Sequence, residues 1–345
     1  MTKVHNFSAG PSILPQEAIE ESIEGLRNFK NSGIPVVSVS HRSPEWEEQM
    51  KESKQMVKDL LNVPDNYEIL FMQGGASLQF CMVPYNLLSE NGKAYYLNTG
   101  SWAKKAIKEA KVFGNVEIAG SSEDQNFNYI PKDFHCPNDA AYLHLTPNNT
   151  IFGTQIKEFP NCGCPVVADM SSDIFSRPID VSKFDLIYAG AQKNLGPAGA
   201  TLVIVNKDIL GKVDRTIPAM LDYNTYIEKD SLYNTPPVYN IYLSYLTLKW
   251  LKEQGGLEGI QKQNEEKARI IYDEIDDNPL FEGTFVMKEQ EMESEFLKYT
   301  EEKNIVGVKG HRSVGGFRAS IYNAMPRESI EYLAETMREF AKKTA

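Results

Sequence analysis

The chain has 345 residues, of which 41% are hydrophobic and 24% are charged, with a formal net charge of −11 and a pI near 5.1. This length suits one large α/β domain plus a smaller one, and the composition is that of an ordinary globular protein. The acidic balance argues against nucleic acid or an anionic membrane surface as the main partner. Small anionic ligands stay compatible with it, because a local basic cluster can outweigh the global sign.

The cysteines and the N-terminus bear on the cellular compartment. Four cysteines in so long a chain make no disulfide framework, and a reducing cytosol suits them best. The N-terminus lacks the apolar core of a signal peptide, and no apolar run approaches the ~20 residues of a membrane span. Cys162 and Cys164 have no second Cys or His pair at ligand spacing. We therefore predict a cytoplasmic protein without a metal site, in which this cysteine pair is structural.

The first half of the chain predicts an α/β fold. Residues 7–15 read as an extended arm, followed by helices over 16–31 and 44–61, the second with Ser43 as its N-cap. Strands and helices then alternate. The predicted strands cover 68–72, 94–97, 116–119, 140–145, 166–168, 186–189 and 201–205, with helices over 78–88 and 101–113 among them. This alternation predicts a mostly parallel seven-stranded sheet between helices, with ligands at the carboxyl ends of the strands.

The chain from about Gly255 onward reads as a second, smaller domain with helices over 257–275, 289–303 and 327–343. We accordingly predict an N-terminal arm (1–15), a large domain (16–254) and a small C-terminal α+β domain (255–345). The small domain carries a glycine-rich segment, 309–318, that contains four basic or titratable side chains. In an acidic protein such a cluster indicates an anionic substrate, and a solvated basic loop is the alternative.

One loop at a predicted strand end holds a lysine among small residues. The stretch 185–205 reads as strand, loop, strand, and Gly190, Ala191 and Gly196 leave room for a flat ligand near Lys193. A lysine in such a tight pocket loses hydration, so its pKa falls and its neutral amine becomes a nucleophile. These properties are those of a Schiff-base lysine. A surface lysine in a hairpin loop is the alternative.

An acid supports the Schiff-base interpretation. Asp169 ends a buried run and lies 24 residues before Lys193. An acid in such a place is costly unless it meets a cation or a donor. Enzymes that use pyridoxal phosphate (PLP) need both a lysine and an acid on the ring nitrogen of the cofactor. The two residues together therefore indicate PLP.

Two further strand ends offer groups for the same ligand. Gly74 and Gly75 lead from a strand into a helix, which places backbone N–H groups and Ser77 at a helix N-terminus, a ready anion site. A plain tight turn is the alternative. Trp102 begins the helix after 98–100, where an indole can stack on a flat ring, whereas core packing is the usual place of a lone tryptophan.

These residues belong to blocks that resemble one enzyme family. The blocks include NFSAGPSILP at the start, SHRSPEW from position 40, GGASLQF from 74, NTGSWA from 98, PNNTIFG from 147, DMSSDIFSRPID from 169, YAGAQKNLGPAG from 188, NTPPVYNIY from 234 and GHRSVGGFRASIYNA from 310. They cover almost the whole chain and are similar to the phosphoserine aminotransferases, which are class-V, fold-type I PLP enzymes. The resemblance implies that the chain converts 3-phosphohydroxypyruvate and L-glutamate to O-phospho-L-serine and 2-oxoglutarate in serine biosynthesis. It leaves open a second activity on 4-phosphohydroxythreonine.

The resemblance also implies roles for individual residues. Lys193 holds PLP as a Schiff base and Asp169 pairs with the pyridine nitrogen, while Trp102 stacks on the ring and Thr150 lies near its phenolic oxygen. The cofactor phosphate is held by Ala76, Ser77 and Gln192, together with Asn234 and Thr235 from the other subunit of a homodimer. Arg318 pairs with the substrate α-carboxylate. The distal phosphate or carboxylate contacts His41, Arg42, His311 and Arg312, and Ser8 lines the entrance.

One segment departs from the family pattern. Between Ile275 and Phe285 the chain has only residues 276–284, where the family carries a longer stretch with an Arg-Ser-x-Met-Asn sequence that leads into a strand. Either the segment is deleted or the sequence skips residues. We favour the second explanation, because loss of a central strand would expose a sheet edge and apolar surface.

Two other functions compete with this interpretation. A cysteine desulfurase or an alanine–glyoxylate aminotransferase would share Lys193 and Asp169, but would give no reason for the two His-Arg pairs. A non-catalytic PLP-binding protein is the second alternative. The joint presence of Lys193, Asp169 and Arg318 argues against it.

Overall fold

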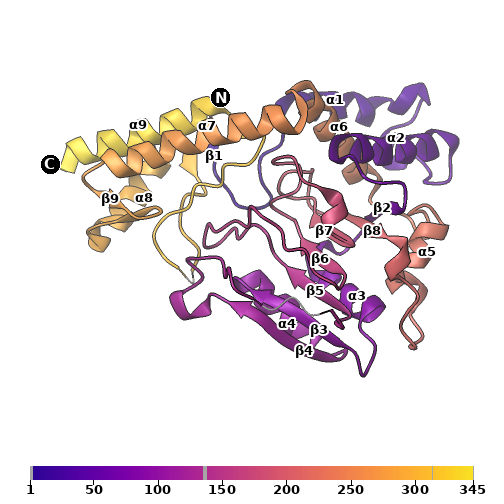
Figure 1. Cartoon of the computed structure of the whole chain (residues 1–345). Helices are drawn as coiled ribbons and strands as arrows, with labels where there is room; N and C mark the ends of the chain where they lie inside the picture. Colours follow the sequence, from indigo (N-terminus) through magenta and orange to yellow (C-terminus); the bar gives the residue numbers. More distant parts are fainter. Residues whose placement is uncertain (1–2, 135–137, 313, 345) are drawn as a thin grey trace.

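The computed structural model describes residues 3–134, 138–312 and 314–344. A twisted sheet lies at the centre of the molecule with helices on both faces, and a second lobe extends to one side of it (Figure 1). The strand order is β2-β8-β7-β6-β5-β3-β4, and β8 alone runs antiparallel to its neighbours. The predicted α/β fold with a mostly parallel seven-stranded sheet is confirmed.

The sheet consists of β2 (Tyr67–Met72), β3 (Lys93–Asn98), β4 (Asn115–Ser121), β5 (Tyr142–Leu145), β6 (Val166–Asp169), β7 (Leu186–Gly190) and β8 (Thr201–Asn206). The helices are α1 (Gln16–Arg27), α2 (Pro44–Leu61), α3 (Gly75–Leu87), α4 (Ser101–Ala110), α5 (Tyr223–Glu228), α6 (Val238–Glu253), α7 (Gly256–Asp277), α8 (Glu293–Glu302) and α9 (Arg327–Thr344). All the predicted helices are present, and all but α2 have shifted ends, whereas the short α5 was not predicted.

Helix ends follow local chemistry. Helix α2 has the predicted bounds, and the Ser43 side chain caps it by accepting a hydrogen bond from the Trp46 backbone N–H at 3.4 Å. Helix α1 ends before the predicted position because Lys30 and Asn31 adopt positive φ angles of 46° and 58°. An L-residue in that conformation cannot continue a right-handed helix.

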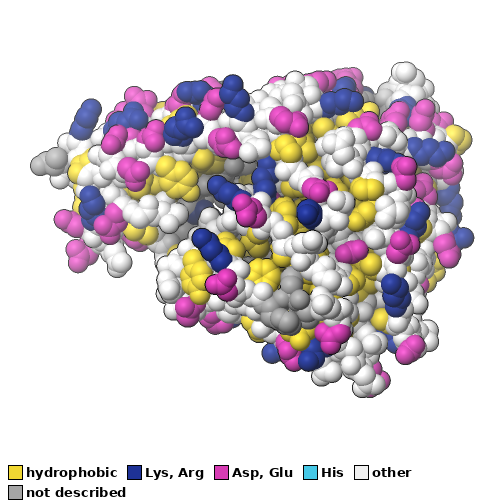
Figure 2. Space-filling model, viewed as in Figure 1, with side chains coloured by type: hydrophobic (Ala, Val, Ile, Leu, Met, Phe, Trp, Pro, Cys, Tyr) yellow, Lys and Arg dark blue, Asp and Glu magenta, His cyan; other side chains and the backbone are white. Residues whose placement is uncertain are grey.

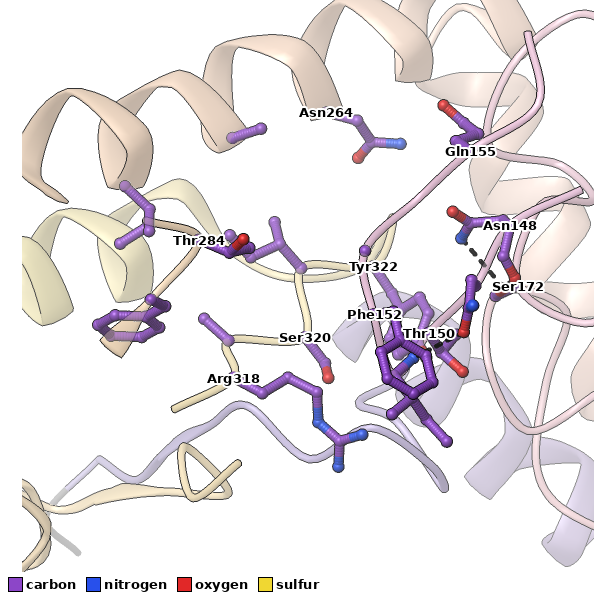
Figure 3. Close-up of a pocket in the computed structure, with 18 of the residues that line it drawn as sticks. Asn148, Thr150, Phe152, Gln155, Ser172, Asn264, Thr284, Arg318, Ser320 and Tyr322 are labelled. Carbon is purple, nitrogen blue, oxygen red and sulfur yellow. Dashed lines mark hydrogen bonds between the residues drawn. The ribbon is translucent and has the colours of Figure 1, made fainter. Parts of the chain in front are cut away.

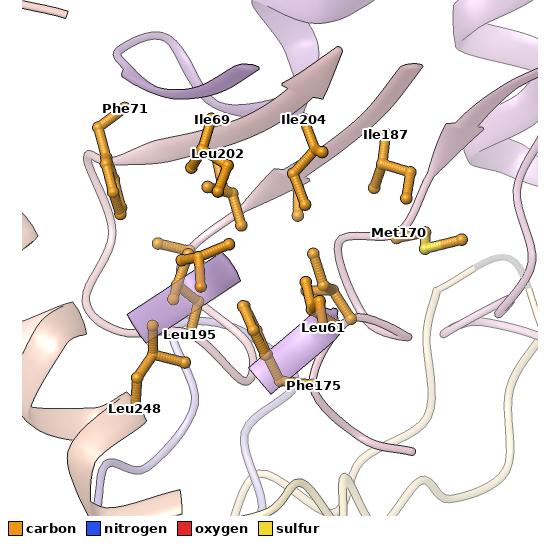
Figure 4. Packing of buried hydrophobic residues seen from close by; sticks show 14 of the residues in the cluster. Leu61, Ile69, Phe71, Met170, Phe175, Ile187, Leu195, Leu202, Ile204 and Leu248 are labelled. Atoms are coloured by element: carbon orange, nitrogen blue, oxygen red, sulfur yellow. The ribbon is translucent and has the colours of Figure 1, made fainter. Parts of the chain in front are cut away.

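One face of the sheet packs against α2 and α6. Figure 4 shows Leu61 of α2 and Leu248 of α6 directed towards Ile204 and Leu202 of β8, all of them buried. Each such side chain contributes roughly 1.5–3 kcal/mol by leaving water. This apolar layer fixes β6, β7 and β8, whose ends carry Asp169 and Lys193.

The opposite face, under α3 and α4, contains a polar group of side chains that we call the interior tyrosine cluster. Its members are Gln79, Tyr96, Tyr142, His144, Tyr188 and Tyr223. The Tyr96 and Tyr142 hydroxyls lie 2.7 Å apart, and the Tyr188 hydroxyl lies 2.8 Å from His144 Nε2. The Tyr223 hydroxyl donates to Gln79 Oε1 at 2.6 Å. Burial lowers the pKa of His144 to about 3, so this ring is neutral.

The second lobe combines the C-terminal helices with the N-terminus. Helices α7 and α9 run side by side (Figure 1). The core of the lobe contains aromatic side chains from distant segments, among them Phe7, Phe296 and Phe340. Strand β1 (His5–Asn6) pairs in parallel with β11 (Ile305–Val306). The predicted N-terminal arm therefore begins inside this lobe. The boundary at 254/255 stays a prediction.

The segment that departs from the family pattern forms a short hairpin. Strand β9 (Phe281–Glu282) pairs antiparallel with β10 (Val286–Met287) directly after α7. Phe281, Phe285 and Met287 are buried in the core of the lobe. The apolar surface that we expected a deletion to expose is covered here, so our reason for favouring skipped residues no longer holds.

Three other findings bear on the predictions from sequence. Cys162 is disulfide-bonded, which corrects the expectation of reduced thiols for that residue, whereas Cys81 and Cys164 are free; Cys136 lies outside the described residues. Across the described ranges, no helix is long and apolar enough to cross a membrane. No cluster of His, Cys, Asp and Glu suited to a metal ion occurs in those same ranges.

Candidate active site

The predicted site residues leave the sheet at one edge. Thr201, the first residue of β8, pairs with Met72 at the end of β2 and with Gly190 at the end of β7. The turns that carry Ser77 and Lys193 therefore flank the same strand. Asp169, at the end of β6, pairs with Tyr188 of β7. Register alone thus brings the glycine turn, the acid and the lysine to neighbouring positions.

The loop that carries Lys193 is fixed through its backbone by the N-terminal arm. The Ser12 N–H donates to the Gln192 carbonyl at 2.9 Å, and the Ser12 hydroxyl donates to the Lys193 carbonyl. The next side chain, Asn194, donates to the carbonyls of Ser172 and Ile174. Contacts on both sides of Lys193 thereby leave its side chain as the part of the loop that can move.

Asp169 is buried and only half satisfied by protein. Its Oδ1 accepts hydrogen bonds from the Ser171 N–H at 3.0 Å and the Ser171 hydroxyl at 2.6 Å. Its Oδ2 has no hydrogen-bond partner among the described residues. Burial raises the pKa of Asp169, and the nearby Lys193 ammonium opposes that rise. The free carboxylate oxygen is available for a cationic ring nitrogen.

Lys193 lies among the groups that the sequence assigned to the same ligand. Burial lowers its pKa, as does the charge of Arg318, whereas Asp169 raises it. Its ammonium is 5.9 Å from the centroid of the Trp102 ring. The Trp102 indole N–H in turn donates to the Thr150 hydroxyl at 3.3 Å. The structure therefore brings together five predicted side chains, namely Lys193, Asp169, Arg318, Trp102 and Thr150. The lowered pKa of Lys193 agrees with the prediction from sequence.

Beside this cluster a cavity of about 820 Å³ separates the sheet domain from the C-terminal lobe. Figure 3 shows Arg318 and Ser320 on one side of it and Thr150 and Asn148 on the other. The Arg318 Nε atom is buried without a hydrogen-bond partner. In Figure 2 the surface is hollowed between the two lobes, with Lys and Arg side chains at the rim. A small acid is the kind of molecule that would satisfy the guanidinium.

The glycine turn has the geometry of an anion site. Gly74 and Gly75 adopt φ angles of 86° and 63°, a region that favours glycine, and α3 begins at Gly75. Ala76 and Ser77 occupy the first turn of α3, where backbone N–H groups have no partner within the helix. The Ser77 side chain is exposed and makes no hydrogen bond to any described residue. The turn therefore presents its donors at the same edge as Lys193.

The two histidines and two arginines predicted to bind the distal group of the substrate have other neighbours in the structure. His311 and Arg312 lie near Arg318, and burial together with these two charges and Lys105 lowers the pKa of His311. His41 is buried and Arg42 is exposed, and no hydrogen bond, ion pair or ring contact among the described residues joins either to Lys193. Within the described part of one chain, the structure thus does not join His41 or Arg42 to the lysine.

The last three predicted residues lie at the margins of the site. Ser8 belongs to the arm, and its N–H donates to Asn6 Oδ1 at 3.0 Å. The Thr235 carbonyl accepts from Gln73 Nε2 at 3.2 Å and from Asn234 Nδ2 at 3.1 Å. Asn234 and Thr235 therefore lie beside the turn that precedes α3. Their assignment to the partner's site stays a prediction.

Sequence reasoning missed a polar link between the two lobes. Asn323 donates through its N–H to Asn194 Oδ1 at 3.1 Å and through its side chain to the Phe175 carbonyl at 2.9 Å. Lys267 of α7 donates to the carbonyls of Tyr322 and Asn323 at 3.1 and 3.0 Å. The only signal was that Asn194 and Asn323 occur within quoted blocks. Their separation of more than a hundred residues hides the contact.

PLP is not part of the structure, but the residues present fit it. The cofactor needs an amine, an acid for its ring nitrogen, an aromatic face and an anion site for its phosphate. The chain supplies these through Lys193, the free oxygen of Asp169, Trp102 and the first turn of α3. All four lie at the carboxyl edge of the sheet, where this class of fold binds its ligands.

Comparison with known proteins decides the family. The model of class-V aminotransferases matches residues 4–333. The phosphoserine aminotransferase of Parabacteroides distasonis is 54% identical over 354 aligned positions that cover 99% of each chain, and that of Flavobacterium johnsoniae is 53% identical with the same coverage. The chain belongs to the phosphoserine aminotransferases, within class V.

Solved structures agree with this membership in the phosphoserine aminotransferases. The enzyme from Bacillus circulans subsp. alkalophilus superposes with a TM-score of 0.95 at 45% identity, covering 99% of each chain. The PLP-bound phosphoserine aminotransferase of Trichomonas vaginalis gives 0.90 at 37% identity, covering 97% of this chain and all of that one. An alanine–glyoxylate aminotransferase from Nostoc, 14% identical with a TM-score of 0.79, shares the fold alone. The fold-type I prediction is thereby confirmed.

Proposed function

We propose that this protein transfers an amino group between L-glutamate and 3-phosphohydroxypyruvate, giving 2-oxoglutarate and O-phospho-L-serine. The membership of the chain in the phosphoserine aminotransferases carries the proposal. The electrostatic coupling of Lys193 with Asp169 and Arg318, and the place of Arg318 in the wall of the cavity, support it. The reaction places the enzyme in serine biosynthesis, and we retain the prediction of a cytoplasmic location.

The residues proposed to bind PLP orient the cofactor before a substrate binds. PLP, when bound, supplies an electron sink that weakens the bonds at the substrate Cα. Asp169 Oδ2 keeps the ring nitrogen protonated, and Trp102 holds the ring plane. The first turn of α3, with Ala76 and Ser77, binds the phosphate, and Gln192 contributes from the lysine loop. Thr150 lies near the phenolic oxygen.

Lys193 moves the proton that the reaction requires. Burial and the charge of Arg318 lower the pKa of its amine against the opposing charge of Asp169, which favours its role as the acceptor of the proton from the substrate Cα. The backbone contacts from Ser12 hold the loop while the side chain swings. The same atom delivers the proton when the second half-reaction runs in reverse. One lysine therefore serves as both anchor and base.

The substrate is oriented by its two acidic ends. Arg318 pairs with the α-carboxylate shared by every substrate, because its guanidinium forms a planar fork. His311, Arg312, His41 and Arg42 contact the distal group, and Ser8 lines the entrance. Since that group is a phosphate in one substrate and a carboxylate in the other, two arginines with two hydrogen-bonding histidines suit both.

A homodimer completes this arrangement. We propose that Asn234 and Thr235 of the partner reach the cofactor phosphate, as the resemblance to the family implies; within one chain the Thr235 carbonyl accepts from Gln73, beside the turn before α3. Sedimentation velocity measures the oligomeric state directly. Mixing Lys193→Ala subunits with Thr235→Ala subunits tests the sharing, since mixed dimers regain one intact site only if Thr235 acts across the interface. A monomeric enzyme with full activity would refute it.

The proposed reaction is tested through the visible spectrum of the holoenzyme. We expect the yellow absorbance of bound PLP to bleach when O-phospho-L-serine is added alone, and to return with 2-oxoglutarate. If the yellow band persists with O-phospho-L-serine but bleaches with L-alanine, the protein is a different class-V aminotransferase. If no preparation binds added PLP, the protein is not a PLP enzyme. 4-Phosphohydroxy-L-threonine in the same assay tests the second activity.

A further inference from the structure

One lysine near the cofactor site has no role in the function proposed so far. Lys105 lies one turn after Trp102 on α4, and its ammonium is 4.2 Å from the centroid of the Trp102 ring. Lys193 approaches the same ring at 5.9 Å. The two ammonium groups therefore lie within about 10 Å of one another, a range over which salt does not fully screen their charges.

Lys105 differs from the neighbouring lysine in its partners. Lys104 forms an ion pair with Glu123, and its ammonium lies over the Phe127 ring. Lys105 is exposed and has no ion pair or hydrogen bond within the described part of the chain. Its contact with the indole holds it in place without neutralising it.

Three other basic side chains, two arginines and one histidine, lie on the same side of the site. Lys105 is one of the charges that lower the pKa of His311, together with Arg318 and Arg312. We call these four residues, Lys105, His311, Arg312 and Arg318, the basic rim. Helix α4 supplies Lys105 from the sheet domain, whereas the other three come from the C-terminal lobe. Arg318 lines the cavity between the lobes, and the electrostatic effect of Lys105 on His311 places α4 close to this segment, where the distal end of a substrate would lie.

We propose that Lys105 determines specificity for the phosphorylated substrate by contributing positive charge to its phosphate. The proposal rests on the function given above. A phosphate near neutral pH carries close to two negative charges and a carboxylate carries one, so an added cation favours the phosphate. An ammonium is a point charge without a fixed fork geometry, so it does not exclude the carboxylate of glutamate. Lys105 thus sets the preference between two substrates that Arg318 treats alike.

The test compares three variants of the holoenzyme. Lys105→Met removes the charge but keeps the side-chain stem on Trp102, Lys105→Arg keeps the charge, and Lys104→Met is the matched control on the same helix. The measured quantity is the concentration of each amino donor that half-saturates bleaching of the PLP absorbance. O-Phospho-L-serine and L-glutamate are used separately, at two salt concentrations.

We expect Lys105→Met to raise the half-saturating concentration of O-phospho-L-serine about 3- to 5-fold and that of glutamate less than 2-fold. Its salt dependence for O-phospho-L-serine should be weaker, whereas Lys105→Arg and Lys104→Met should resemble the wild type. Equal changes for both donors, or no change, would overturn the proposal. If O-phospho-L-serine does not bleach the PLP absorbance of the wild-type enzyme itself, the proposed function is wrong. That result differs from the two outcomes above, which concern the variants alone.

Discussion

Polar side chains are buried both in the interior tyrosine cluster and at the carboxyl edge of the sheet, but the two regions differ in how many of these groups have a hydrogen-bond partner. In the interior tyrosine cluster nearly every polar atom has a protein partner, and His144 Nδ1 is the exception. At the carboxyl edge, buried atoms of Thr99, Thr146 and Arg318 have none. A buried polar atom without a partner costs free energy in the absence of a ligand. The satisfied groups of the cluster therefore fit a structural role, and the buried Arg318 Nε atom at the cavity fits a ligand, although atoms without partners also occur away from the cavity, at Trp46 and Ser244.

The largest expected effect breaks the site and leaves the fold intact. Lys193→Ala should lower transamination by at least about 10³-fold, because no other group lies in reach to act as both anchor and base. Steady-state production of 2-oxoglutarate measures it. The melting temperature of the apoprotein should change little. Lys183→Ala, an exposed lysine on the same domain, is the control, and substantial activity in the Lys193 variant would contradict the mechanism.

Asp169→Asn should lower the rate by about 10²-fold, since an amide cannot hold the ring nitrogen in its protonated form. It should also lower the pKa of Lys193 further below its usual value in the apoprotein, because Asp169 raises that pKa. Arg318→Ala should do the opposite. NMR of ¹³C-methylated lysines measures both directions.

Asp173→Asn is the matched control for this pair. Asp173 is buried as well, but it forms an ion pair with Arg177 at 2.8 Å. Its loss should destabilise the protein while leaving the Lys193 titration unchanged. A shift of that titration in the Asp173 variant would mean that general loosening, and not the local charge, sets the pKa.

The interior cluster predicts a change in stability with no direct role in catalysis. His144→Phe leaves the Tyr188 hydroxyl without its partner and should lower the free energy of unfolding by about 1–3 kcal/mol at pH 7. Because the folded-state pKa of His144 is about 3 and the unfolded value is ordinary, the unfolded chain binds more protons between these values. The free energy of unfolding of the wild type therefore decreases as the pH is lowered through that window. The difference in the free energy of unfolding between variant and wild type should therefore shrink by about 2 kcal/mol when the pH is lowered from 7 to 5. Urea unfolding at the two pH values measures it.

The smallest effect predicted here concerns Arg42, which has no contact with Lys193 among the described residues of one chain. Arg42→Ala should raise the KM for O-phospho-L-serine about 10-fold without weakening PLP binding, as a lost charge-assisted contact would. Arg27→Ala, a surface arginine of α1, is its control. An unchanged KM would remove Arg42 from the substrate site.

The sequence predicted those parts of the site whose signal is local. Lys193 among small residues and Asp169 at a strand end were both identified from their own surroundings, and the strand register brought them together as predicted. The Asn194–Asn323 link and the contact of Ser12 with the lysine loop were missed, because each joins segments far apart in sequence. No periodicity or composition records such a contact. Helix ends shifted where positive φ angles, as at Lys30, ended a regular pattern.

The N-terminal arm has a consequence for the order in which the molecule can be made. Phe7 and Ser12 leave the ribosome among the first residues, yet Phe7 packs in the lobe built from 271–340, and Ser12 binds the lysine loop. The first strand pairs with Ile305 and Val306, nearly 300 positions later. During synthesis the arm has to stay undocked until the last tenth of the chain emerges. A nascent chain halted before residue 305 therefore lacks the strand with which the start of the arm pairs.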